Sequence, residues 1–159
     1  MDTSVQILQF ELSSIHDRPV FEYNEILFLF DSGSNMPVWC KGEEFFVDTY
    51  KGATKTTHVA HLSGFGKDYT VASVYIIPEF VLMKDNVKFS IKNLYVAVAE
   101  YMSMEFDFIL SNTAFSKVDT MIANSTNALR FSFSNDRPFY CTPLKAGTEV
   151  KKISVWAKE

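Results

Sequence analysis

The sequence predicts a mostly-β domain, and three observations lead to this fold class. Aromatic residues make up 15% of the 159 residues, with 15 Phe and 7 Tyr. Together with many Val, Ile and Thr residues, they favour strands over helices. Several short segments alternate apolar and polar residues between turn-forming residues, which is the pattern of half-buried strands. Only one segment has the spacing of an amphipathic helix.

The length and overall composition are those of one globular domain. Hydrophobic residues make up 47% of the chain and charged residues 21%, and a chain of this length can bury a substantial core. Because no internal repeat or linker-like stretch interrupts the chain, we expect a single domain over residues 1–159.

The first part of the chain predicts three strands. Val5–Leu12 alternates apolar and polar residues with one slip between Ile7 and Leu8, which indicates a strand with a bulge. A second strand, Val20–Tyr23, follows a turn. Ile26–Phe30 is a continuous apolar run, which is typical of a strand buried on both faces.

The rest of the chain predicts further strands and one short helix. The helix is expected at Ser111–Ile122, where apolar residues recur at spacings near 3.6 and Ser111 or Asn112 can act as the N-cap. The further strands are expected at Phe45–Val47, Thr54–Leu62, Tyr69–Ile77, Val87–Ile91, Leu94–Ala99, Phe106–Leu110, Leu129–Phe133 and Val150–Trp156.

Charge and composition argue against several kinds of partner. The formal net charge is −4 and no basic cluster is present, so we expect no nucleic-acid partner. No apolar run approaches the roughly 20 residues of a membrane span, and the N-terminus lacks the features of a signal peptide. Two cysteines, Cys40 and Cys141, fit no metal or disulfide framework. We therefore expect a cytoplasmic protein that needs no membrane and no cofactor.

The motif with the clearest chemical meaning is the turn Asp31-Ser32-Gly33-Ser34, which follows the buried strand Ile26–Phe30 directly. The strand holds the backbone rigidly, and Gly33 permits a tight turn with close approach of another segment. Asp31 would then project from a fixed position. An Asp-Ser-Gly sequence is also ordinary turn chemistry, so these three residues alone leave a structural role open.

A single aspartate is a poor catalyst at neutral pH, whereas a pair has useful chemistry. Two carboxylates about 3 Å apart cannot both ionise, so they share one proton. One member then acts as general base on a water molecule, and the other acts as general acid toward a carbonyl group.

Leu27 to Ser34 resembles the signature of retropepsin-like aspartic peptidases, in which apolar residues precede Asp-(Ser/Thr)-Gly-(Ala/Ser). The resemblance covers roughly residues 20 to 135 and implies a closed acid-protease-like β-barrel with a flap hairpin and one short helix. It implies a single-domain aspartic endopeptidase that is active as a homodimer on a peptide or protein substrate. In this reading Asp31 is the catalytic residue, and Ser32, Gly33 and Ser34 form the active-site turn.

Two further segments extend the resemblance in the expected order. Ser63, Gly64, Phe65 and Gly66 lie between strand-like segments and resemble the flap hairpin, which covers bound peptide. Phe106 to Ser111 is similar to the second family element, in which an apolar pair and a Gly lead into a short helix. Ile109, Leu110 and Ser111 would form this second wall of the site. Ser111 stands where the family has Gly, so it adds bulk and a hydroxyl group close to Asp31.

A dimer follows from the number of motifs. The chain has one Asp-(Ser/Thr)-Gly sequence, and the chemistry requires two aspartates, so a twofold dimer must supply the second. The resemblance implies that terminal strands pair at such an interface, and Val5–Leu12 and Val150–Trp156 are the candidates. The alternative is that both belong to ordinary sheet within one protomer.

Three other residues suggest chemistry that we do not expect. His58 and His61 point to opposite faces of a strand, because side chains alternate with a period of two, so we expect no metal site. Cys40 is expected to be a small buried hydrophobic residue rather than a nucleophile. Two other functions remain open: a non-catalytic peptide-binding or dimerisation module on the same fold, and an unrelated β-domain in which Asp31 merely shapes a turn.

Overall fold

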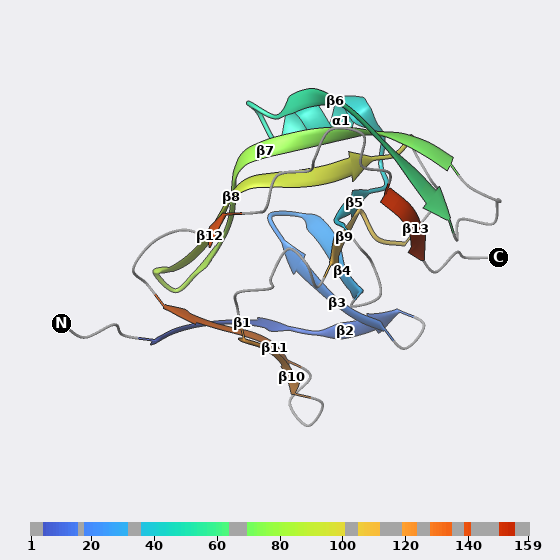
Figure 1. Ribbon diagram of the computed structural model, residues 1–159. Coiled ribbons are helices and arrows are strands. Elements are labelled where there is room, and N and C mark those ends of the chain that lie inside the picture. Colours follow the sequence, from blue (N-terminus) through green and yellow to red (C-terminus); the bar gives the residue numbers. More distant parts are fainter. Residues whose placement is uncertain are drawn as a thin grey trace.

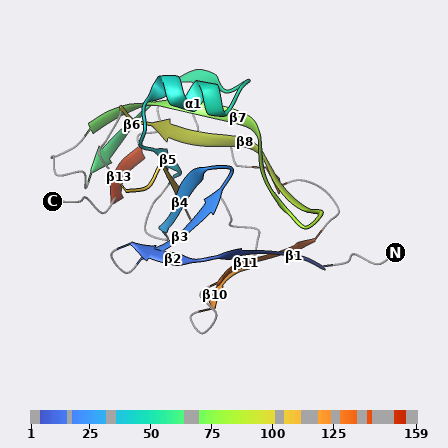
Figure 2. The same ribbon diagram turned by 180° about the vertical axis from the view of Figure 1, so that it is seen from behind.

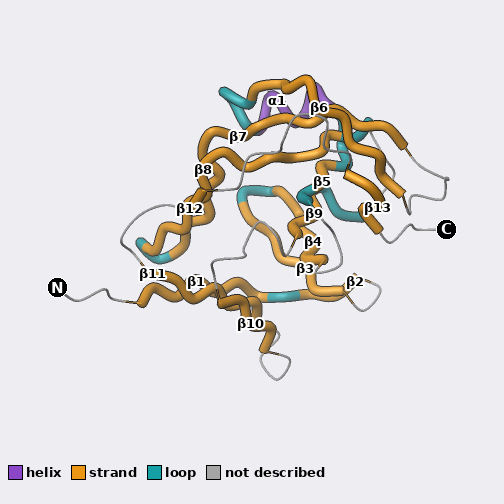
Figure 3. The backbone as a smooth tube through the Cα atoms, viewed as in Figure 1, coloured by secondary structure: helices purple, strands orange, loops and turns teal. Residues whose placement is uncertain are grey.

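The structure is a computed structural model that describes residues 5–15, 18–31, 36–63, 70–100, 105–111, 119–123, 128–134, 139–140 and 150–154. Strands dominate these ranges, which confirms the mostly-β prediction (Figure 3). The one helix among them is α1 (Glu43–Thr49), and no helix in these ranges is long and apolar enough to cross a lipid bilayer.

Most strands belong to one large mixed sheet with the order β13-β6-β7-β8-β5-β9-β4-β3-β2, and β12 pairs with β8 beside this path. Figure 1 shows how β7 and β8 arch over the strands at the centre of the molecule. The strands are β2 (Ser13–Ile15), β3 (Arg18–Tyr23), β4 (Ile26–Asp31), β5 (Val38–Trp39), β6 (Thr54–Ser63), β7 (Thr70–Lys84), β8 (Val87–Val98), β9 (Phe108–Ser111), β12 (Phe139–Tyr140) and β13 (Val150–Ser154).

A separate antiparallel sheet has the order β1-β11-β10. It consists of β1 (Val5–Glu11), β10 (Asp119–Ala123) and β11 (Ala128–Ser134), and it lies below the large sheet in Figure 1. The β1–β11 register runs without a break from Val5 opposite Ser134 to Glu11 opposite Ala128. The predicted bulge is therefore wrong: the apolar slip is accommodated by leaving Ile7 half exposed, whereas Leu8 is buried.

The large sheet is open, so the predicted closed barrel is wrong. Its end strands in the described part of the chain are β13 and β2, and these two strands do not pair with each other. Figure 2, seen from behind, shows β13 beside the end of β6, with β2 below it. Closure of a barrel requires the two end strands to pair, and that pairing is missing here.

The centre of the large sheet separates two hydrophobic clusters. Alternate residues of β4 enter different clusters: Phe28 belongs to the first and Leu29 to the second. In β9, Phe108 and Leu110 belong to the first cluster, and Ile109 belongs to the second. Both strands are thus buried on both faces, which is why Ile26–Phe30 reads as a continuous apolar run.

A column of aromatic rings links the small sheet to the centre of the large one. Phe10 stacks on Phe21 with ring centroids 4.9 Å apart, and Phe21 stacks on Phe28 at 5.1 Å. Phe28 in turn stacks on Phe108 at 5.4 Å. Such ring pairs each contribute about 0.5–1.5 kcal/mol beyond their buried area, so the column fixes β1, β3, β4 and β9 relative to one another.

The long β7–β8 hairpin bends sharply at Pro78 and Asn93. Asn93 has a φ of 55°, and the side-chain alternation of both strands slips at this level. Ile77 and Phe80 therefore both enter the first cluster although they are an odd number of residues apart. This bend explains why the sequence suggested two strands, Val87–Ile91 and Leu94–Ala99, where the structure has the single strand β8.

Helix α1 occupies the segment where a strand, Phe45–Val47, was predicted, so that prediction is wrong. Gly42 caps the helix with a φ of 92°, which favours glycine, and the Phe46 N–H donates to the Gly42 carbonyl. Phe46 is fully buried, and the Trp39 Nε1–H donates to the Gly42 carbonyl at 2.8 Å. These contacts, together with the acidic first turn, favour helix over strand.

The prediction of a helix at Ser111–Ile122 is wrong for the residues that the structure describes at both ends of this range. Ser111 ends β9, and Asp119–Ala123 is strand β10, which pairs with β11. Residues 112–118 lie outside the described residues. Cross-strand pairing with β11 satisfies the backbone of residues 119–123 and overrides the helical spacing.

Both strands predicted for a dimer interface pair within the chain. β1 pairs with β11, and β13 pairs in parallel with β6. In-chain sheet is the alternative that the sequence left open. Pairing between two copies of the chain stays a prediction.

Candidate functional site

Asp31 is the last residue of β4, a strand in which Ile26, Phe28, Leu29 and Phe30 are buried. The residues before it alternate between the two hydrophobic clusters, so the backbone that leads to Asp31 is held from both faces. The active-site turn that the sequence predicts at Ser32, Gly33 and Ser34 lies outside the described residues. A functional group at the end of such a strand sits on a rigid support.

Strand β9 lies parallel to β4 and ends at the same level. Their register places Leu29 opposite Ile109, Phe30 opposite Leu110 and Asp31 opposite Ser111. Two segments that are far apart in the sequence, the Asp31 motif and the predicted second wall, thus become neighbours. Ile109 and Leu110 are fully buried core residues.

Asp107 fixes this register from the other end of the two strands. Its carboxylate Oδ2 accepts a hydrogen bond from the Leu27 N–H at 2.8 Å, and its own N–H donates to the Leu27 carbonyl at 2.9 Å. The Asp107 carbonyl also accepts from the Cys40 N–H at 2.9 Å. Sequence reasoning assigned no role to this residue, although a lone Asp between Phe106 and Phe108 in an apolar segment is a signal of a specific polar contact.

Strand β5 completes the support on the other side of β9. Val38 lies opposite Ile109 and Trp39 opposite Phe108 in antiparallel register, while Val38 also pairs with Ala97 of β8. β9 therefore lies between β4 and β5, although these two strands follow each other in the chain. A central strand with partners on both edges cannot slip without breaking two ladders.

The segment predicted as a flap, Ser63 to Gly66, falls in the sequence at the end of β6 and before β7. The strands pair antiparallel up to Leu62 opposite Thr70, with one irregularity between Lys55 and Val59. Ser63 ends β6, whereas Gly64, Phe65 and Gly66 lie outside the described residues. Ala60 and Leu62 are buried in the same cluster as Leu29 and Ile109, so one face of this hairpin packs on the β4–β9 layer.

Helix α1 is tied to the same hairpin by polar contacts. The Tyr75 hydroxyl of β7 donates to the Glu43 carboxylate in the first turn of α1. The Lys55 ammonium group of β6 lies 3.3 Å from the same carboxylate. These contacts join the helix to both arms of the hairpin.

Cys40 is buried beside the site strands, as expected for a small hydrophobic residue. Burial raises the pKa of the Cys40 thiol to about 12; Lys41 acts against this rise and Asp107 adds to it. Burial also raises the pKa of Tyr50, with further contributions from Tyr23 and Asp107. Both side chains are neutral at physiological pH; Cys40 belongs to the second cluster, and Tyr50 is partly buried against the first.

The pKa of the exposed Glu79 carboxylate is lowered, whereas the pKa values of Cys40 and Tyr50 are raised. A hydrogen bond from Lys92 lowers the pKa of Glu79, with smaller favourable contributions from Ser90, Lys88 and the Lys92 charge, while partial desolvation raises it. Lys88 lies 3.6 Å from the same carboxylate. This cluster bridges β7 and β8 beyond the bend and lies apart from the Asp31 strand.

The described residues contain no group of three or more His, Cys, Asp or Glu side chains that could hold a metal ion. His58 lies against the Tyr95 ring, with centroids 6.5 Å apart. His61 lies further along the same strand, β6.

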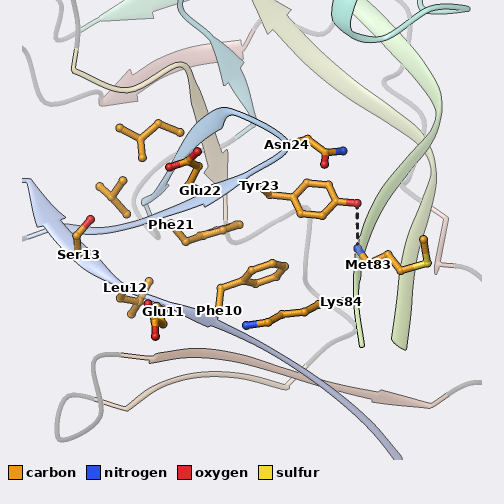
Figure 4. A pocket seen from close by; sticks show the side chains of 12 residues that line it. Phe10, Glu11, Leu12, Ser13, Phe21, Glu22, Tyr23, Asn24, Met83 and Lys84 are labelled. Carbon is orange, nitrogen blue, oxygen red and sulfur yellow. Dashed lines mark hydrogen bonds between the residues drawn. The ribbon is translucent and has the colours of Figure 1, made fainter. Parts of the chain in front are cut away.

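A groove with a volume of about 510 Å³ lies elsewhere in the described part of the molecule. It runs between β1, β3 and the far end of β7, where the Met83 N–H donates to the Tyr23 hydroxyl (Figure 4). Lys84 borders it and donates to the Gln9 carbonyl. None of the predicted site residues lines this groove.

The structure thus brings the backbones of Asp31 and Ser111 together and sets the β6–β7 hairpin over the layer that carries them. Of the predicted site residues, the structure describes the backbone of Asp31, Ser63 and Ser111, and the backbone and side chains of Ile109 and Leu110. No protein-family model matches the chain, and no curated protein matches it either.

Proposed function

We propose that the chain is an aspartic endopeptidase with a retropepsin-like arrangement of strands, in which two copies each contribute Asp31. The observation that carries the proposal is the parallel pairing of β4 with β9, which sets Asp31 opposite Ser111. This pairing joins the two motifs on which the sequence resemblance rests. The β6–β7 hairpin supports the proposal further, because its arms pair as a flap requires.

In the proposed reaction the two carboxylates share one proton. The ionised Asp31 takes a proton from a water molecule, whose oxygen attacks the carbonyl carbon of the substrate. The protonated Asp31 of the second copy gives its proton to the carbonyl oxygen. The tetrahedral intermediate then collapses. The first Asp31 gives the proton that it took from water to the amine nitrogen, the C–N bond breaks, and a hydroxyl group of the intermediate returns a proton to the Asp31 of the second copy. A carboxylic acid and an amine are released, and the pair again shares one proton.

The substrate in this proposal is an extended peptide that binds chiefly through its main chain. Strand addition uses the backbone N–H and carbonyl groups of an exposed sheet edge, and the flap arms are strands of this sheet. The groove near Tyr23 and Lys84 has no part in the proposal, because it lies away from Asp31.

A non-catalytic peptide-binding module on the same fold is the second candidate. It is favoured by the pairing of β13 with β6, in which an extended segment lies along the edge of a flap arm. It is also favoured by Ser111, which stands where the resemblance expects Gly.

The test is peptide cleavage by the parent chain and by Asp31→Asn over acidic to neutral pH, with dimer mass measured in parallel. Asp31→Asn keeps the size and turn chemistry of the side chain, so it should remove cleavage by a factor of about 10³ or more while the dimer persists. Ser111→Gly is a second arm, because it removes the side chain next to Asp31 and should raise the cleavage rate. No cleavage of varied peptides by the parent at any pH, with no binding of a pepstatin-type inhibitor, would leave the binding module as the better account.

A further inference from the structure

The outer edge of β6 is occupied by the C-terminal strand of the same chain. β7 pairs with one edge of β6, and β13 pairs with the other. The β13 register places Val150 opposite Ala60, Ile153 opposite Leu62 and Ser154 opposite Ser63, in parallel. In Figures 1 and 2, β13 lies along the far end of β6.

This edge is the one that a peptide adding to the flap arm must use. A strand has two hydrogen-bonding edges, and β7 pairs with the inner edge of β6 at Thr54–Lys55 and again at Val59–Leu62. In the described ranges, the outer edge pairs with β13 at Ala60–Ser63. A peptide substrate and β13 would therefore compete for the same backbone groups.

The β13 pairing has the features of a replaceable contact. It is short, it is parallel, and its register is irregular between Val150 and Ile153, whereas the β6–β7 ladder is longer and antiparallel. Parallel pairing is slightly weaker per residue than antiparallel pairing. The two consecutive lysines, Lys151 and Lys152, are typical of edge strands that resist pairing with other molecules.

We propose that the outer edge of β6 at Ala60–Ser63 is a strand-accepting surface and that residues 150–154 are its built-in occupant. The partner that this surface fits is an extended peptide segment that pairs through its main chain and displaces β13. The statement that this peptide is a substrate rests on the proposed function. The statement that β13 occupies the edge of β6 does not depend on it. The form in which β13 pairs with β6 is then a resting state, in which the chain covers its own peptide-binding edge.

The test uses the full chain with Asp31→Asn, so that no peptide is consumed, and adds Ile153→Pro. Proline removes the N–H of a paired residue and disfavours the flanking strand conformation. Lys158→Pro, beyond the end of β13, is the matched control. Hydrogen exchange at Ala60–Ser63 should become at least about tenfold faster in Ile153→Pro and stay unchanged in the control. Exchange in β8 should stay unchanged in both variants, which shows that the fold is intact.

Peptide binding gives the second readout. A synthetic peptide with the sequence of residues 148–156 should bind the Ile153→Pro chain at least about tenfold more tightly than the chain with an intact β13. Unchanged exchange at Ala60–Ser63, or equal peptide affinity for both chains, overturns the proposal. If Ile153→Pro also increases exchange in β8, Val150→Pro replaces it at the start of the strand, with the same criteria.

Failure of this inference is distinguishable from failure of the proposed function. Ile153→Pro with Asp31 restored should cleave peptide with a lower KM than the parent, because the edge is free. If exchange and peptide binding change as expected but no variant cleaves peptide, the strand-accepting edge stands and the chain is a binding module. If cleavage occurs but exchange does not change, the enzyme stands and β13 is an ordinary edge strand.

Discussion

Asp107 shows how one polar side chain sets the position of the site strands. It binds both the N–H and the carbonyl of Leu27, and its own carbonyl accepts from Cys40. The start of β9 is thereby locked to the start of β4, and the regular ladder carries that alignment to Asp31 and Ser111. The residue acts through the backbone and needs no contact with a substrate.

Asp107→Ala should lower the free energy of unfolding by about 1–3 kcal/mol, because the Leu27 N–H loses its side-chain acceptor in a part-buried position. Asp107→Asn keeps an acceptor oxygen on a side chain of the same length, so it should lower the free energy of unfolding clearly less. Urea unfolding of the three chains measures the difference. Equal losses for Ala and Asn would mean that the side-chain hydrogen bond does not hold the register.

Cys40 gives a prediction about pH and reactivity. The folded chain keeps the thiol proton up to about pH 12, whereas the unfolded thiol releases it near its ordinary pKa of 9.0. The contribution of the protonated Cys40 thiol to the free energy of unfolding is therefore complete below pH 9.0. The free energy of unfolding then falls as the pH rises from 9.0 to about 12. Cys40→Ala should show a shallower alkaline decline than the parent.

The same burial predicts slow modification of the thiol. In a Cys141→Ser background, a thiol reagent at pH 8 should react with Cys40 at least about 100-fold faster in urea than in buffer. Fast labelling of the folded chain would show that Cys40 is accessible and would restore it as a candidate nucleophile.

At the scale of elements, the bend in the β7–β8 hairpin decides how the core is built. Beyond Pro78 and Asn93, the hairpin turns toward the small sheet, so that Phe80 and Phe89 join the same cluster as Phe10. Asn93 holds a left-handed conformation that β-branched residues adopt at a cost of about 1–2 kcal/mol.

Asn93→Val should therefore lower the free energy of unfolding by about 1–2 kcal/mol. Asn93→Gly adopts positive φ without strain and should stay within about 0.5 kcal/mol of the parent. Thermal and urea unfolding measure both. If Gly costs as much as Val, the bend does not depend on the conformation of residue 93.

The elements that the sequence predicted best are those whose burial leaves a direct pattern. Ile26–Phe30 was found because a strand covered on both faces has no polar positions. α1 was missed because Phe45–Val47 is a short apolar run between charged residues, which is also typical of a buried strand, although Gly42 followed by two glutamates is a helix-start signal. β10 was missed because its partner strand, and not its own residues, determines its conformation.

At the scale of the whole molecule, the large sheet is not closed into a barrel, because its end strands in the described ranges, β13 and β2, do not pair with each other. Closure depends on which distant strands become neighbours, and no local pattern in either strand encodes that choice. The adjacency of Asp31 and Ser111 was expected only through family resemblance, and the β4–β9 register now gives it a physical basis.

The central claim concerns two copies of the chain, because one copy holds one Asp-Ser-Gly motif. The most direct test is to mix the two kinds of chain. The parent chain is kept at fixed concentration and combined with a rising excess of the Asp31→Asn chain, and the initial rate of peptide cleavage is measured. If each active site needs Asp31 from both copies, mixed dimers are inactive, so the rate should fall toward zero as the excess grows. A rate that stays constant at tenfold excess, with mixed dimers demonstrated by mass, would contradict the shared site.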